Sequence, residues 1–116
     1  MFVLYGIKNC DTVKKARQFL EDHDIKFRFH DVRADGLSEQ TVLGWAQGVS
    51  WEKLLNTRSK TWHGLNASEK QGLNEAKAAH LICQHPTVLK RPLLHTGKSI
   101  IVGFDEAVYQ DIVDHA

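Results

Sequence analysis

The sequence of 116 residues predicts an α/β fold with a four-stranded mixed sheet, and three patterns support this prediction. Short apolar runs bounded by turn residues occur near both ends of the chain, where they are typical of strands. Segments with apolar residues at helical spacing follow these runs. From about residue 37 to residue 86 the pattern is helical throughout. The expected order is therefore strand–helix–strand, a helical insert, and strand–strand–helix.

The first part of the chain predicts a βαβ unit. Residues 2–5 form an apolar run that indicates an interior strand. Residues 13–23 have apolar side chains at helical spacing, and either Asp11 or Thr12 is the expected N-cap of this helix. Residues 26–31 alternate between apolar and polar side chains, which predicts a strand with one buried face. A right-handed crossover would make the two strands parallel.

The middle of the chain predicts a series of helices. Ser38 and Glu39 are typical of a helix start, so the first helix is expected over residues 41–47. A short helix is expected over 51–55, and one or two more over 68–85. Glycines separate these segments, which fits their role as helix breakers.

The last part predicts two strands and a helix. Residues 93–95 and 99–102 are the strands, joined by a tight turn in which Gly97 supplies a positive φ. Residues 104–115 form the last helix, with Asp105 as its cap and three packed side chains: Val108, Ile112 and Val113. The whole order is the thioredoxin-like arrangement. We expect a single domain over residues 1–116, with the helical insert at about 37–86.

Composition excludes several classes of function. The formal net charge is +1 and 25% of residues are charged, so nothing predicts binding to nucleic acid or to an anionic membrane. No apolar segment approaches the ~20 residues of a bilayer span, and no signal peptide is visible. Two distant cysteines do not form a disulfide framework, and no histidine spacing indicates a metal site. We expect a cytoplasmic protein with reduced thiols.

Cys10 is the strongest candidate for a catalytic residue. It lies in the loop between the first strand and the first helix, just before the expected N-cap. A thiol there faces the positive end of the helix dipole and unpaired N–H groups. Such a position favours the thiolate, which is the nucleophilic form. A structural cysteine would more often lie inside a strand or on the buried face of a helix.

The second cysteine, Cys83, has a different setting. It falls on a predicted helix face with Leu73, Ala76 and His80. Free cysteine is among the most buried residue types, so packing is the expected role. If Cys10 has no partner within the chain, its disulfide or sulfenic acid must be resolved by an external thiol, of which glutathione is the obvious cytosolic example.

Two arginines are candidates for ligand binding. Arg58 follows the short helix at 51–55, and Arg91 precedes Pro92 at the entry to a strand. A guanidinium stabilises a nearby thiolate, and its planar donors fit a carboxylate or an oxyanion. The alternative is that both are solvated surface charges, which is the usual fate of arginine. The Arg-Pro step is extended, and spacing alone does not establish a cis bond.

Four segments together resemble the arsenate reductase-related family, which includes glutaredoxin-coupled arsenate reductases, Spx transcriptional regulators and YffB-like proteins. The segments are Gly6 to Ala16, Leu55 to Arg58, Gln84 to Pro86 together with Lys90 to Leu93, and Val102 to Phe104. The resemblance covers essentially the whole chain and is nearest to the YffB-like branch. It implies a thioredoxin-like fold, Cys10 as redox nucleophile, Arg58 and Arg91 near it, and a cis Pro92.

Two departures from the family separate this chain from its better-known branches. Arsenate reductases of the family carry a third arginine after the last strand, where this chain has Val102, Gly103 and Phe104. Each lost charge-assisted contact removes ~1.5–3 kcal/mol of oxyanion binding. Spx regulators use a Cys-x-x-Cys switch, and the second cysteine is replaced here by Val13.

These observations predict a glutathione-dependent thiol–disulfide oxidoreductase with Cys10 as its single redox cysteine. Arg58, Arg91, Pro92, Lys8 and Asn9 are the expected substrate-binding residues. No bound cofactor or metal is expected. Glutathione is the reducing co-substrate, glutaredoxin is a further candidate partner, and the protein is expected to be a monomer. The alternatives are a non-catalytic Spx-like regulator that binds RNA polymerase, or a weak arsenate reductase.

Overall fold

The computed structural model describes all residues from 1 to 116 and divides the chain into two compact units. The first unit comprises residues 1–31 and 91–116, and the second comprises residues 32–90. The segment expected as a helical insert, 37–86, lies inside the second unit. None of the helices has the length and the apolar character that a membrane span requires.

The first unit contains the four-stranded mixed sheet that the sequence predicts. Its strands are β1 (Phe2–Gly6), β2 (Phe27–Asp31), β3 (Leu93–His95) and β4 (Ile100–Val102), in the order β2-β1-β3-β4. β1 pairs in parallel with β2, whereas β3 pairs antiparallel with both β1 and β4. The parallel pair confirms the βαβ unit. Gly97, between β3 and β4, has a φ of 93°, as the expected turn requires.

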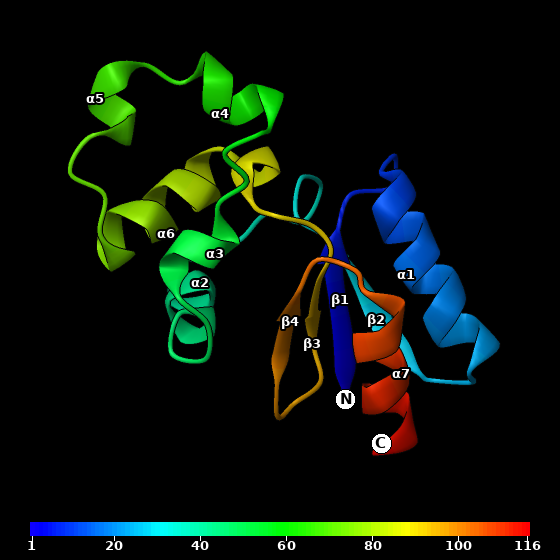
Figure 1. The fold of residues 1–116 in the computed structure, drawn as a ribbon. Helices are drawn as coiled ribbons and strands as arrows, with labels where there is room; N and C mark the ends of the chain where they lie inside the picture. The colour runs from blue at the N-terminus through cyan, green and yellow to red at the C-terminus, as the bar shows by residue number, and fades with distance from the viewer. The chain divides into compact units, whose positions relative to one another are not determined.

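Helices α1 (Asp11–Asp22) and α7 (Glu106–Asp114) cover one face of this sheet (Figure 1). The core beneath them joins side chains from both helices to β1 and β3, which contribute the paired residues Leu4 and Leu94. Tyr109 lies at its centre with no exposed surface, and its ring meets those of Phe19 and Phe104 edge-on. The buried cluster is Leu4, Ala16, Phe19, Leu20, Leu94 and Tyr109.

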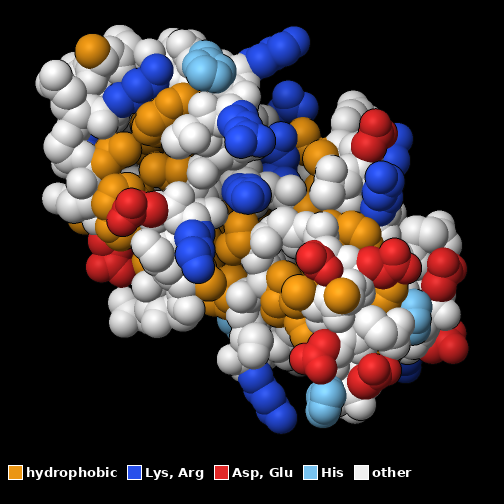
Figure 2. Space-filling model, in the orientation of Figure 1, with side chains coloured by type: hydrophobic (Ala, Val, Ile, Leu, Met, Phe, Trp, Pro, Cys, Tyr) orange, Lys and Arg blue, Asp and Glu red, His pale blue; other side chains and the backbone are white.

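The outer face of α7 corrects one packing prediction. Val108, expected in the core, is 42% exposed, because the buried position of this turn is taken by Tyr109, one residue on. Successive helical residues point about 100° apart, so both cannot face the sheet. Val113 is partly buried against the core, and Asp105 caps the helix as predicted, accepting N–H bonds from Ala107 and Val108. Figure 2 shows acidic side chains gathered over α7 around an apolar patch.

The second unit is helical, as predicted. Ser38 caps α2 through the N–H of Thr41, and Ser50 caps α3. One short helix, α4, was not predicted; it begins after Ser59 and is capped by it. The region 68–85 forms two helices, and a 3₁₀ turn follows them. The elements are α2 (Glu39–Trp45), α3 (Trp51–Leu54), α4 (Lys60–Gly64), α5 (Ala67–Lys70), α6 (Glu75–Gln84) and η1 (Pro86–Val88).

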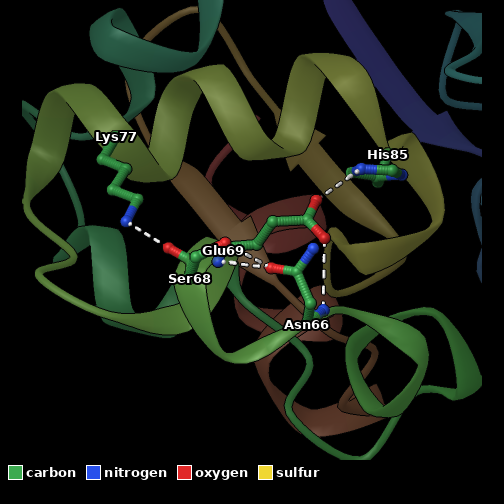
Figure 3. A network of polar contacts seen from close by, with 5 residues as sticks. All are labelled: Asn66, Ser68, Glu69, Lys77 and His85. Atoms are coloured by element: carbon green, nitrogen blue, oxygen red, sulfur yellow. Dashed lines mark hydrogen bonds and ion pairs between the residues drawn. The ribbon is translucent and has the colours of Figure 1, made fainter.

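A polar network ties α5 to α6 (Figure 3). Asn66 and Glu69 form a reciprocal capping box at the start of α5. The other carboxylate oxygen of Glu69 lies 3.2 Å from Nε2 of His85, the residue that ends α6. Lys77 of α6 donates to the carbonyl of Ser68 at 2.9 Å. These contacts anchor a helix of four residues that could not be stable alone.

Candidate functional site

Cys10 is itself the N-cap of α1, which corrects the expectation that Asp11 or Thr12 would be. Its backbone is extended, with φ −113° and ψ 121°, and its carbonyl accepts the N–H of Lys14 at 3.0 Å. The helix begins at Asp11, before the first apolar residue of the pattern. The spacing of apolar residues, which begins at Val13, therefore predicted too late a start for this helix. The thiol is half-buried and not in a disulfide.

The cap at Cys10 differs from every other α-helix cap in the chain. Each of the other six helices begins after a Ser, Asn or Asp whose side chain accepts a backbone N–H. Cys10 makes no such bond, although α1 is the longest helix, at 12 residues. An unmade cap costs about 1 kcal/mol. A residue that breaks a rule the rest of the chain obeys is expected at a functional site.

The Arg91-Pro92 step lies at the end of the sheet where β1 leads to Cys10. Tyr5 of β1 pairs with Leu93 of β3, so the residues just before Leu93 adjoin the exit of β1. The Arg91–Pro92 bond is cis, as the family resemblance implies. Pro92 is buried, and its carbonyl accepts the N–H of Gly103 at 2.8 Å. This carbonyl thus already has one hydrogen-bond partner within the fold.

Other charged and polar groups share this end of the sheet. Arg91 is half-buried, and Lys8 and Asn9 form an exposed turn just before Cys10. Asp31, at the end of β2, pairs with Gly6 and is only 8% exposed. Sequence reasoning missed this buried carboxylate, and the signal available was a charged residue at the last position of a half-buried strand. Five predicted residues therefore lie at this end of the sheet: Cys10, Arg91, Pro92, Lys8 and Asn9.

Arg58 belongs to the second unit. It is exposed, and its backbone N–H donates to the side-chain oxygen of Asn56 at 3.1 Å. Asn56 in turn donates its own N–H to the carbonyl of Val88 at 2.8 Å. The turn that carries Arg58 is thus fixed to its own unit, while the guanidinium remains accessible.

Cys83 is half-buried in α6 rather than in the core. The buried residues of α6 are Ala78, Ala79, Leu81 and Ile82, whereas Ala76 and His80, which share the face of Cys83, are exposed. Burial, and to a lesser extent the negative charge of Glu39, raises the pKa of the Cys83 thiol. A thiol held in its protonated form is a poor nucleophile. The raised pKa makes the Cys83 thiol a weaker nucleophile near neutral pH than an unperturbed cysteine.

The positions after β4 have structural roles that leave no room for a third arginine. Gly103 has a φ of 82°, a backbone angle that residues other than glycine rarely adopt. The ring of Phe104 lies 6.0 Å from that of Phe19 and 4.7 Å from that of Tyr109, between ring centres. No group of three or more His, Cys, Asp or Glu side chains is placed to hold a metal ion. The chemical groups at this end of the sheet include the Cys10 thiol, the cations of Lys8 and Arg91, and the Asp31 carboxylate.

Comparison with known proteins identifies the family. Residues 5–112 match the model of the ArsC family. The chain belongs to the ArsC family. A relative from Haemophilus influenzae, itself uncharacterised, is 40% identical over 110 residues, which cover 95% of this chain and 96% of the relative. The global transcriptional regulator Spx of Lactiplantibacillus plantarum is 31% identical over 109 residues, covering 91% of this chain and 81% of the regulator.

Solved structures of ArsC-family members confirm the thioredoxin-like fold. A YffB protein superposes with a TM-score of 0.93 at 38% identity, covering 97% of this chain and 99% of the other. An arsenate reductase-related protein from Brucella melitensis gives a TM-score of 0.73 at 40% identity, covering 95% of this chain and 92% of the other. The family thus contains both reductase-like proteins and Spx regulators, and the choice between them depends on the site.

Proposed function

We propose that this protein is a glutathione-dependent thiol–disulfide oxidoreductase with Cys10 as its single redox cysteine. The observation that carries the proposal is the helix cap: position 10 holds a thiol that makes no capping bond, whereas all six other α-helices are capped by a polar side chain. The free N–H groups of the first turn of α1 remain available to a thiolate. Selection for reactivity at Cys10 explains the absent cap.

The reaction proceeds through a mixed disulfide with glutathione. The Cys10 thiolate attacks the glutathionyl sulfur of a substrate disulfide, and the substrate leaves as a thiolate that takes a proton. A second glutathione thiolate then attacks the glutathionyl sulfur on Cys10. Glutathione disulfide leaves, and the Cys10 thiolate returns. Each cycle consumes one free glutathione, whose sulfur leaves with the glutathionyl sulfur of the substrate as glutathione disulfide, and the proton that this glutathione loses balances the one that the substrate thiolate takes. No second cysteine of the chain takes part. Glutaredoxin could replace the second glutathione.

The cationic and polar residues hold the glutathionyl group. Arg58 and Arg91 bind its carboxylates and stabilise the thiolate, since guanidinium donors match a carboxylate in geometry. Arg91 at the strand entry, together with the Pro92 region, lies beside the peptide-like part of the ligand. Lys8 and Asn9 line the approach to Cys10. We infer a monomer that works in the cytoplasm and needs no bound cofactor or metal.

The second candidate function is that of a regulator that binds RNA polymerase. The similarity to Spx proteins over 91% of the chain favours it. A regulator that is switched by a disulfide would need a second cysteine at position 13, and this position holds Val13, which is fully buried. Weak arsenate reduction is the third candidate, and the packing of Phe104 in place of a third arginine argues against it.

The test is reduction of a glutathionylated peptide by glutathione. Wild type and Cys83→Ser should turn over, whereas Cys10→Ser should not. A wild-type protein that shows no turnover but forms a stable complex with RNA polymerase would favour the regulator. Arsenate, offered with glutathione and glutaredoxin in a parallel assay, should be reduced far more slowly than the peptide.

A further inference from the structure

The first turn of α1 has no capping side chain, yet it has to hold Cys10 in a fixed position. A direct contact between β1 and α1 does this instead. Gly6 is the last residue of β1, and Val13 lies in the first turn of α1. A Cβ built on Gly6 would lie 2.7 Å from Cγ2 and 2.9 Å from Cγ1 of Val13. The valine side chain therefore rests on the glycine backbone, with no space between them.

Neither side of this contact can give way easily. Val13 has no exposed surface, and a β-branched side chain in a helix strongly prefers one χ1 rotamer. Gly6 is buried, and its position in β1 is fixed by pairing with Asp31 of β2. Its φ lies outside the left-handed region, so the glycine is needed for space and not for its backbone conformation.

We propose that Gly6 and Val13 are positioning residues for Cys10. Counted from the N-cap at Cys10, Val13 is the third helical residue, whose N–H a Ser or Asn cap would bind. Packing Val13 on Gly6 fixes that N–H without a cap. Position 10 is thereby left to a thiol, and the first-turn N–H groups face it. The inference rests on the proposed nucleophilic role of Cys10 and names what keeps that nucleophile in place.

The experiment measures the rate of Cys10 alkylation by iodoacetamide at pH 7. All variants carry Cys83→Ser, so that one thiol is counted. Gly6→Ala should lower the rate roughly threefold to tenfold, which is the scale of a displaced helix-terminus interaction. Adding Gly6→Ala to Val13→Ala should change the rate less than twofold, because the smaller side chain makes room. The matched control is Gly44→Ala, since Gly44 lies within α2 and a Cβ there would meet nothing within 4 Å.

An unchanged rate in Gly6→Ala would overturn the inference. So would an equal loss of rate in the Val13 and Val13→Ala backgrounds, because the effect would then not depend on this contact. If Gly6→Ala does not fold, Val13→Ala and the double variant provide the test. Their alkylation rates should both lie at least threefold below that of the parent and should agree with each other within twofold. A rate in Val13→Ala equal to that of the parent would contradict the inference. Alkylation requires no glutathione, so a failure of the proposed function would appear separately, as absent glutathione turnover in a protein whose alkylation follows this pattern.

Discussion

Replacing Cys10 by Ser should stabilise the protein while abolishing its proposed activity. Cys10 has the extended backbone of an N-cap and makes no capping bond. A serine hydroxyl at this position can accept the N–H of Thr12 or Val13, as Ser38 and Ser59 do at their own helices. Such a bond contributes ~0.5–2 kcal/mol, typically about 1 kcal/mol, to the free energy of unfolding. For a domain of this size, 1 kcal/mol raises Tm by roughly 3–6 °C.

The assay is urea and thermal unfolding of wild type, Cys10→Ser and Cys10→Ala. The difference between Cys10→Ser and Cys10→Ala isolates the capping bond, because neither variant has a thiol. Ser38→Ala is the matched control in the opposite direction and should lose about 1 kcal/mol. Equal stability of Cys10→Ser and Cys10→Ala would refute the claim that the first-turn N–H groups of α1 are free to bind a capping side chain at position 10.

Three further predictions concern the other cysteine, the arginines and the core. Cys83→Ser should keep nearly full turnover, because burial and Glu39 raise the pKa of the Cys83 thiol; an oxidised Cys10–Cys83 bridge in mass spectrometry would contradict this. Arg58→Lys and Arg91→Lys should each weaken glutathione binding about tenfold or more although the charge is kept, because the loss of a charge-assisted contact costs ~1.5–3 kcal/mol. Arg28→Lys is the control at an exposed arginine. Unchanged binding in both Arg58→Ala and Arg91→Ala would remove these residues from the site. Tyr109→Phe should leave stability unchanged or raise it by about 1 kcal/mol, because the buried hydroxyl has no hydrogen-bond partner. Burial raises the pKa of Tyr109, so above about pH 10 the unfolded chain loses a proton that the folded chain keeps, and wild-type stability should fall there more steeply than that of Tyr109→Phe.

Much of the fold could be predicted from local patterns. The alternation in residues 26–31, the tight turn at Gly97 and the cap at Asp105 each depend on neighbouring residues, and each is confirmed. The errors arose where the choice depends on packing. Val108 and Tyr109 are adjacent apolar residues of α7, and only the aromatic cluster around Phe19 decides which of them is buried.

Some features of the candidate site could likewise be predicted from local sequence, whereas others depend on packing. The position of Cys10 before a helix is readable in the sequence, and the pairing of β1 with β3 then brings Arg91 and Pro92 to it. The missing cap at Cys10 could not be foreseen, because it required knowing that the helix starts at Asp11. The contact of Gly6 with Val13 could not be foreseen either, since sequence does not reveal how closely a helix approaches a strand.

The central claim, that Cys10 is a thiol which carries glutathione during turnover, is tested most directly by mass spectrometry of the intact protein. Wild type and Cys83→Ser, treated with glutathione disulfide, should each gain one glutathionyl group, located on Cys10 by peptide mapping and removed by excess glutathione. Cys10→Ser should gain none. A glutathionyl group on Cys83 with Cys10 unmodified, or no adduct on the folded wild-type protein, would contradict the account.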